Sequence, residues 1–434
     1  MDIISLYKKF IECNQIISTD SRTLELGSLF FGWKGEILDG NNFASDALEK
    51  GAKYAVIDNP DFFIDHRTIV VPNVIKAFQD LARHHRRQFN IPVIAIGGSN
   101  GKTTTKELVA DILSTQKKVV SSHASLNNHI GVPMTLFRIT NHTDIAVIEM
   151  GANHIGEIAE LCIIAAPTHG LITNIGRDHI GHFGSQDAII KANAELYDYL
   201  RLSKGEALVN KNNLTLMKFS EGVRQTCYAE GVIGEFGIES HDTAPYVSVI
   251  WKGSLIETQL TGEYNVENIL AAIAVGVYFD IRENNIISAL ESYVPQNNRS
   301  EILETIQGNI VIKDFYNANR TSMKASLNNL AHIQKKYPEK KNIAILGDML
   351  DLGEYTRMEH QAVLDYAISL DIKIIILIGK EFSQIKNIKD NVTQYLSVEQ
   401  ALLTMKEKLA GNSIILLKAS NGTNFKKLFS ETAW

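Results

Sequence analysis

Residues 93–105 read Val-Ile-Ala-Ile-Gly-Gly-Ser-Asn-Gly-Lys-Thr-Thr-Thr, and this stretch decides the fold of the chain. The four apolar residues 93–96 predict a buried strand, and the residues after the glycines predict a helix that runs to about residue 114. Glycine lets backbone N–H groups approach phosphate oxygens, and the N-terminus of the following helix is partly positive. The stretch therefore predicts a phosphate-binding loop in an α/β domain.

The loop also carries side chains suited to a nucleotide and its metal ion. Lys102 offers a positive charge to phosphate oxygens, and Thr103 offers a hydroxyl to Mg²⁺. The predicted ATP contacts are Gly98, Ser99, Asn100, Gly101, Lys102, Thr103 and Thr104. Ile96 occupies the first glycine position of the full GxxxxGK[ST] pattern, so the alternative is a plain turn. The position between a strand and a helix favours the phosphate loop.

Acidic and imidazole groups follow two other predicted strands. Glu149 ends the strand 145–149, where a carboxylate of a parallel sheet reaches a phosphate-bound Mg²⁺, although a strand-end glutamate is often simply solvated. His179 and His182 follow the strand 170–174. Their HxxH spacing could suggest zinc, but no third ligand of suitable spacing accompanies them. We interpret His179 as a magnesium ligand, with loop packing as the alternative.

Two adjacent asparagines, Asn127 and Asn128, precede the segment 130–133. Such a pair most often forms a turn. Beside a phosphate loop, the neutral amides are also suited to hold a polar substrate. Both interpretations stay open.

Strand-like and helical runs alternate along the chain, which predicts three α/β domains in series at residues 1–88, 89–296 and 297–434. The central domain carries the phosphate loop on a largely parallel sheet. In the third domain, strands at 310–313, 343–346, 374–378 and 414–417 predict a small open, Rossmann-like sheet.

Composition excludes several classes of protein. A net charge of -6 argues against nucleic acid as the partner, since a phosphate backbone requires a clustered basic surface. Three widely spaced cysteines form no disulfide framework. The first ten residues lack the basic-then-apolar order typical of a signal peptide, and the apolar runs are of strand length, too short for a membrane span. We expect a cytoplasmic protein, with neither a membrane nor nucleic acid as partner.

Motifs over nearly the whole chain are similar to those of the Mur ligases, a family of peptidoglycan synthesis. They are TDSR at 19–22, GSLFF at 27–31, GSNGKTTTKE at 98–107, NNHIGVP at 127–133, EMGANHIGEI at 149–158, NRS at 298–300, YNAN at 316–319, GDM at 347–349 and LGE at 352–354. The last two most resemble the members that join D-Ala-D-Ala to UDP-muramoyl-tripeptide. The resemblance implies a three-domain, monomeric enzyme with a central P-loop ATPase domain that closes on its substrates and uses ATP and Mg²⁺.

The resemblance also implies roles for individual residues. In the implied reaction ATP phosphorylates the tripeptide carboxylate, and the amine then attacks the acyl phosphate. The implied catalytic residues are Lys102, Glu149, His179 and Asn193, and the implied metal ligands are Thr103, Glu149 and His179. Further nucleotide contacts are Asn268, Arg299, Asp314, Tyr316 and Asn319. The implied substrate contacts are Ser21, Arg22, Lys34, Gly35, Asn127 and Asn128.

Several positions depart from the family pattern. Asn193 stands where the family has a lysine that is carbamoylated to bridge magnesium, and Lys191, about 200° round the helix, faces elsewhere. Arg320 replaces a proline, and the segment 179–185 lacks an acidic residue. Further departures lie at Gly97, Ala124, Ser125 and Asn421. Besides a working ligase, the departures leave two alternatives, a paralogue that joins another carboxylate and amine, and a non-catalytic nucleotide-binding homologue.

Overall fold

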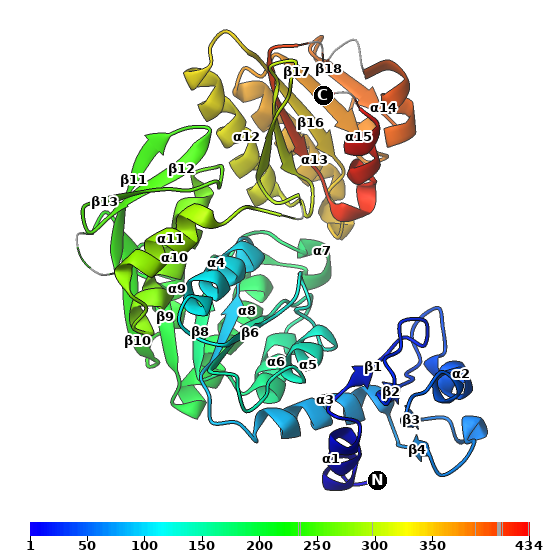
Figure 1. Cartoon of the computed structure of the whole chain (residues 1–434). Coiled ribbons are helices and arrows are strands. Elements are labelled where there is room, and N and C mark those ends of the chain that lie inside the picture. The colour runs from blue at the N-terminus through cyan, green and yellow to red at the C-terminus, as the bar shows by residue number, and fades with distance from the viewer. Residues whose placement is uncertain are drawn as a thin grey trace.

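The computed structural model describes residues 1–434 except 233, 235, 297, 387, 406–408, 410 and 433. The described chain forms three sheets, each flanked by helices, that follow one another from the N-terminus to the C-terminus (Figure 1). The expected class, a three-part α/β architecture, is confirmed. Residue 297, where we predicted a domain boundary, lies outside the described residues, and the boundaries stay a prediction.

The N-terminal part is a four-stranded parallel sheet of order β1-β2-β3-β4. Its strands are β1 (Ile17–Ser18), β2 (Leu29–Phe31), β3 (Tyr54–Ile57) and β4 (Thr68–Val70). Its helices are α1 (Ile3–Glu12), η1 (Gly40–Phe43), α2 (Ala44–Glu49), η2 (Pro60–Phe62) and α3 (Val74–Arg86).

The central sheet has nine strands in the order β13-β12-β11-β10-β9-β8-β5-β7-β6. The strands are β5 (Val93–Gly97), β6 (Val119–Ser121), β7 (Ile145–Glu149), β8 (His169–Ile172), β9 (Glu206–Asn210), β10 (Arg224–Glu230), β11 (Gly237–Thr243), β12 (Tyr246–Trp251) and β13 (Ser254–Glu257). The helices are α4 (Lys102–Ser114), α5 (Gly131–Leu136), α6 (Glu157–Ala165), α7 (Ile180–Phe183), α8 (Gln186–Ser203), α9 (Leu214–Phe219), α10 (Tyr264–Tyr278) and α11 (Glu283–Ser292).

The topology of the central sheet positions the site. Along the sheet order, the strands from β6 through β5 to β11 pair in parallel, as predicted. Strands β12 and β13 continue the sheet beyond β11 with antiparallel pairing, an extension that we did not predict. After β5 the chain passes first to β6 and β7 on one side and then to β8 and β9 on the other. The carboxyl end of β5 is therefore a topological switch point, where open α/β sheets bind their ligands.

The C-terminal sheet has the order β14-β15-β19-β16-β17-β18, parallel except for β14. Its strands are β14 (Glu301–Glu304), β15 (Ile310–Asp314), β16 (Lys341–Gly347), β17 (Ile374–Ile378), β18 (Val392–Tyr395) and β19 (Ser413–Lys418). Its helices are α12 (Arg320–Lys336), η3 (Gly353–Tyr355), α13 (Thr356–Ser369), η4 (Phe382–Gln384), α14 (Val398–Thr404), η6 (Asn421–Thr423) and α15 (Phe425–Glu431). All four strands predicted for this domain are present.

One apolar core joins the N-terminal part to the central part. Helix α3 packs on α5 and α6, below the central sheet in Figure 1. The ring of Phe137, just after α5, lies 5.1 Å from that of Phe10 and 5.2 Å from that of Phe78, measured between ring centroids. All three rings are buried in the same hydrophobic cluster.

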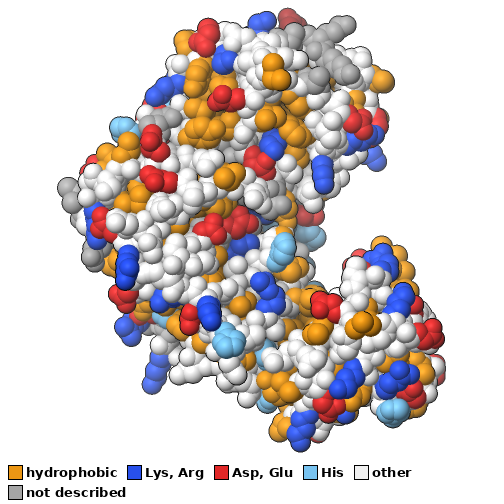
Figure 2. Space-filling view, in the orientation of Figure 1, with side chains coloured by type: hydrophobic (Ala, Val, Ile, Leu, Met, Phe, Trp, Pro, Cys, Tyr) orange, Lys and Arg blue, Asp and Glu red, His pale blue; other side chains and the backbone are white. Residues whose placement is uncertain are grey.

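The C-terminal domain contacts the central domain at two edges. At one edge Gly181 of α7 lies so close to η3 that a Cβ on it would collide with the backbone of Gly353. At the other, Asp242 of β11 accepts from His332 Nε2 of α12 at 3.1 Å. The N-terminal domain instead faces the C-terminal domain across an open hollow (Figure 2). No helix within the described residues is long and apolar enough to cross a membrane.

Candidate active site

The loop between β5 and α4 turns at two glycines. Gly98 has φ +118° and Gly101 has φ +80°, a region that side chains rarely adopt. A Cβ on Gly98 would also collide with the hydroxyl of Thr173, and a Cβ on Gly101 with the side-chain oxygen of Asn268. Gly101 caps α4 without a side-chain hydrogen bond, so the first N–H groups of the helix face the site free of a capping side chain.

The segment after β8 shapes this loop from the side. Asn174 accepts from Asn100 N at 3.1 Å and donates its amide to Asn100 O at 3.0 Å. Thr173 donates to the same carbonyl at 2.6 Å. Ser99 donates from its hydroxyl to the buried carboxylate of Asp178. The segment after β8 therefore holds the loop in its turned conformation.

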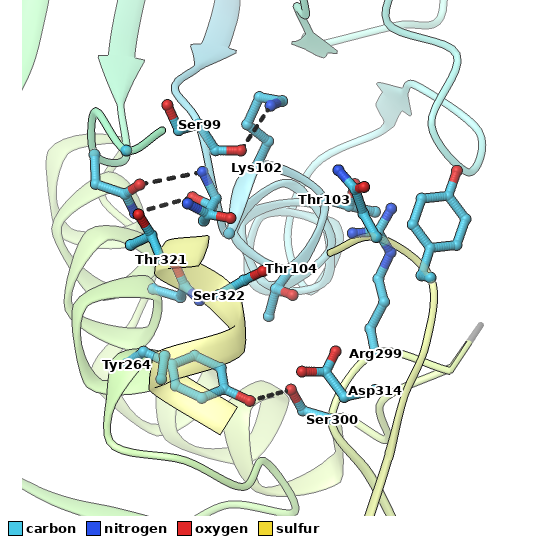
Figure 3. Close-up of a pocket in the computed structure, with 18 of the residues that line it drawn as sticks. Ser99, Lys102, Thr103, Thr104, Tyr264, Arg299, Ser300, Asp314, Thr321 and Ser322 are labelled. Carbon is cyan, nitrogen blue, oxygen red and sulfur yellow. Dashed lines mark hydrogen bonds between the residues drawn. The ribbon is translucent and has the colours of Figure 1, made fainter. Parts of the chain in front are cut away.

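Lys102 folds back over the loop that it follows. Its ammonium donates to Gly98 O at 2.6 Å. It also donates to Ser99 O at 3.1 Å (Figure 3). The charge is thus held at the mouth of the loop, where phosphate oxygens of a nucleotide would meet it.

The loop opens into a cavity of about 510 Å³ between the central and C-terminal domains. Most of the predicted site residues line it, namely Ser99, Asn100, Gly101, Lys102, Thr103, Thr104, Asn127, Glu149, His179, Asn268, Arg299, Asp314 and Tyr316. Gly98 and Asn319 lie just behind the lining: Gly98 turns the loop, and Asn319 donates its amide to Asn100 Oδ1 at 2.9 Å. Residues distant in sequence, from two domains, thus meet at the phosphate loop.

Glu149 lies at the end of β7 and is only 1% exposed. Its Oε1 accepts from Asn127 Nδ2 at 2.8 Å, whereas Oε2 is buried with no hydrogen-bond partner. Asn128 instead turns away and accepts from the backbone N–H groups of Ile130 and Gly131 at the start of α5. The turn interpretation therefore applies to Asn128, whereas a role of Asn127 in holding a polar substrate stays a prediction.

His179 has a left-handed backbone conformation and lines the cavity. Its Nδ1 is buried without a hydrogen bond and lies 3.4 Å from Asp351 Oδ2 of the C-terminal domain. Burial lowers the pKa of His179, which favours the neutral imidazole that ligates metal ions. His182 Nε2 lies 3.5 Å from the same carboxylate. Within the described residues, no three carboxylate, imidazole or thiol groups gather as a metal cluster.

The C-terminal domain and the linker before it supply polar groups on the far side of the cavity (Figure 3). Asp314, at the end of β15, is held by Lys418 Nζ at 3.0 Å and by the hydroxyl of Ser326 at 2.6 Å. The guanidinium of Arg299 lies over the ring of Tyr316, 3.7 Å from its centroid. Such a stacked arginine presents its remaining donors edge-on, which suits an anionic ligand.

Asn193 does not line the cavity. Its side-chain amide donates to Ile189 O, one turn earlier on α8, at 2.9 Å. Lys191 is exposed, as its position on the helix predicts. Glu195 caps α6 by accepting from Gly156 N at 2.6 Å and Ala159 N at 2.9 Å. The structure thus places Asn193 outside the lining of the cavity, with its side chain bonded within its own helix.

The predicted sugar contacts lie in the N-terminal domain, apart from the cavity. Ser21 is buried, and the exposed Arg22 pairs with Asp20 at 2.6 Å. Lys34 and Gly35 lie in an exposed turn. They belong to the domain that borders the open hollow of Figure 2.

An ion pair joins the two domains beside the loop. Glu359 of α13 is 1% exposed, and its Oε1 lies 3.2 Å from Arg177 of the central domain and 3.6 Å from Arg320 of α12. Arg320 is the residue that replaces the family proline.

Sequence reasoning missed two supports of the site. Asp178 was not among the predicted site residues, although it holds Ser99. Lys106 was passed over, although it follows Lys102 by four residues and therefore lies on the same face of α4, a signal that the spacing alone contained.

Comparisons with known proteins find matches to all three parts of the chain. Three family models match consecutive parts of the chain: "Mur ligase family, catalytic domain" at 15–96, "Mur ligase middle domain" at 96–276 and "Mur ligase, glutamate ligase domain" at 298–421. A UDP-N-acetylmuramoyl-tripeptide–D-alanyl-D-alanine ligase of Bacillus subtilis is 31% identical over 427 residues, which cover 96% of this chain and 92% of the relative. The chain belongs to the Mur ligase family. This Mur ligase is accordingly an ATP-dependent enzyme that forms amide bonds and releases ADP.

Other relatives extend the likeness. A ligase of the same name from Synechocystis is 34% identical, with 96% of this Mur ligase and 91% of the relative covered. Among solved structures, MurF from Acinetobacter baumannii superposes with a TM-score of 0.84 at 28% identity, covering 96% of this chain and 92% of that one. MurF from Thermotoga maritima, solved in complex with ADP, shares the fold with a TM-score of 0.83 at 22% identity.

Proposed function

We propose that this Mur ligase joins D-Ala-D-Ala to UDP-N-acetylmuramoyl-tripeptide in peptidoglycan synthesis. One observation carries the proposal: the phosphate loop, the buried carboxylate of Glu149 and polar groups of the C-terminal domain converge on one cavity. The likeness to ligases of that name, which extends over 96% of the chain, supports this choice of substrates.

The chemistry needs alignment and charge compensation more than a side-chain nucleophile. The tripeptide carboxylate attacks the γ-phosphorus of ATP, and ADP leaves. The amine of D-Ala-D-Ala then attacks the carbonyl carbon of the acyl phosphate, and inorganic phosphate leaves as the amide forms. Lys102 and the N-terminus of α4 stabilise the negative charge of the phosphates.

The residues at the phosphate end of the cavity fit a magnesium ion bound to the nucleotide. Two buried atoms, Glu149 Oε2 and His179 Nδ1, have no hydrogen-bond partner, and Thr103 lines the same cavity. Mg²⁺ keeps several waters and needs few protein ligands beside phosphate oxygens. Bound there, the ion would offset the repulsion between the carboxylate and the γ-phosphate.

The remaining assignments follow the same resemblance. Bound nucleotide is contacted by Asn268, Arg299, Asp314, Tyr316 and Asn319, and the UDP-sugar by Ser21, Arg22, Lys34 and Gly35. Asn127 supports Glu149, while Asn128 shapes the adjoining turn. The enzyme acts as a cytoplasmic monomer on small-molecule substrates.

A second candidate is a paralogue that joins a different carboxylate and amine. The position of Asn193 favours it, because a side chain bonded to Ile189 O offers no anionic oxygen at the place of the family's modified lysine.

ADP release tests both candidates. ATP is mixed with UDP-muramoyl-tripeptide and D-Ala-D-Ala, and each is omitted in turn. We expect steady ADP release only when all three are present. Release with another carboxylate and amine, but not with these, favours the paralogue. Formation of AMP and pyrophosphate contradicts the mechanism of both candidates.

A further inference from the structure

Lys106 is a lysine buried in the protein interior. It lies on α4, one turn after Lys102, and is 2% exposed. Burial of an ammonium group is unfavourable unless the charge is compensated. A buried lysine beside a nucleotide site therefore calls for a specific role.

The charge of Lys106 faces Glu149. Its Nζ lies 3.7 Å from Glu149 Oε2, beyond hydrogen-bond distance. Instead, Nζ donates to Ala124 O at 2.6 Å. The lysine thus balances the charge of the carboxylate while leaving the lone pairs of Oε2 without a donor.

Lys106 also holds the loop that supports Glu149 from the other side. The carbonyl that it binds belongs to Ala124, whose backbone is left-handed with φ +47°. The next residue, Ser125, bonds to Tyr316 of the C-terminal domain. Asn127, three residues after Ala124, holds Oε1 of Glu149. One ammonium group therefore compensates the charge of the carboxylate and holds the loop that orients it.

We propose that Lys106 is a positioning residue, which keeps Glu149 Oε2 open toward the phosphate end of the cavity and so sets the affinity for the metal complex of the nucleotide. The inference rests on the proposed function, because Glu149 acts there as a ligand of Mg²⁺. A neutral residue at position 106 would leave the carboxylate without a counter-charge. A residue that donated directly to Oε2 would occupy the atom that the metal needs.

Calorimetric titration with ADP, with and without Mg²⁺, tests this role without turnover. In Lys106→Met, we expect ADP binding without metal to stay near that of the wild type. The gain in affinity that Mg²⁺ adds should fall by about tenfold or more, which is typical of losing a group that orients a metal ligand. Lys106→Arg, which keeps the charge, should recover most of the gain. Lys118→Met, a change of an exposed lysine just beyond α4, is the matched control.

Lys106→Met leaves the carboxylate of Glu149 buried without a counter-charge, and the variant therefore risks misfolding. The double variant Lys106→Met/Glu149→Gln removes both charges and should fold. Its response to Mg²⁺ should equal that of Glu149→Gln alone, because the lysine acts through the glutamate.

Three results would overturn the proposal. They are a full gain from Mg²⁺ in Lys106→Met, equal losses in Lys106→Met and Lys106→Arg, and a double variant that responds less than Glu149→Gln. These outcomes are independent of the substrates. A wild-type enzyme that binds ADP with Mg²⁺ but forms no product contradicts the proposed function and not the role of Lys106.

Discussion

Replacing Glu359 by glutamine removes a negative charge that the central and C-terminal domains share. The carboxylate is buried, with Arg177 of the central domain at 3.2 Å and Arg320 of its own domain at 3.6 Å. The change to glutamine keeps the shape of the side chain, so any effect comes from the charge. We expect the variant to fold and to close less readily on nucleotide.

The magnitude follows from the exposure of the partners. Loss of one member of a fully buried ion pair costs about 3–5 kcal/mol. The side chains of Arg177 and Arg320 are 35% and 30% exposed, so water screens both pairs. We therefore expect a total loss of about 1–2 kcal/mol. Only the pair with Arg177 joins the two domains. The free energy of domain closure should therefore become less favourable by roughly 1 kcal/mol, which shifts the equilibrium about fivefold toward the open form.

Two measurements check this prediction. The KM for ATP should rise about fivefold, in line with the shift above, and small-angle scattering with nucleotide present should give a larger radius of gyration. The control is Glu339→Gln, which changes an exposed glutamate of the same domain. Arg320→Pro is a second control, since proline is tolerated at the first position of α12 and Glu359 keeps Arg177. Equal KM values and equal scattering for Glu359→Gln and Glu339→Gln would refute the reasoning.

Three further predictions concern the loop and helix α8. Lys102→Ala should abolish ADP release without lowering the melting temperature, because the ammonium lies in the cavity; undiminished release would contradict the phosphate-loop assignment. Gly101→Ala should weaken ADP binding by about tenfold in calorimetry, since φ +80° costs a side chain about 1–2 kcal/mol and the new Cβ displaces Asn268; unchanged affinity would contradict this. Asn193→Lys, assayed with bicarbonate, should raise turnover and lower the magnesium requirement; an unchanged magnesium dependence would instead mean that Asn193 only packs on its helix.

Local features of the site could be predicted from the sequence. The strand and helix around the phosphate loop appear as β5 (Val93–Gly97) and α4 (Lys102–Ser114), close to the predicted 93–96 and the predicted helix end near 114. Their signals lie within one short window, because glycine conformations and apolar runs act on neighbouring residues. The turn chemistry of Asn128 is local in the same way.

Contacts between distant segments could not be predicted. Asn174 holds Asn100 and Glu359 meets Arg177 only because the sheet order and the domain contact bring them together. The antiparallel extension of β11–β13 escaped prediction for a related reason. Alternating runs predict strands, but pairing direction depends on the connections made in three dimensions. The burial of Lys106 likewise depends on what covers α4.

The contact of Phe10 and Phe78 with Phe137 also bears on how relatives of this enzyme could be recombined. A crossover near residue 88 would pair the α3 of one parent with the α5 and α6 of another, and close-packed interiors tolerate mismatched volumes poorly. Hybrid enzymes that exchange the N-terminal domain should therefore carry residues 131–165 from the same parent. An exchange in the linker between α11 and β14 likewise divides a shared core, because Ile180 and Ile189 of the central domain are buried in the same cluster as Met349 of the C-terminal domain, so a foreign C-terminal domain also has to match α7 and α8.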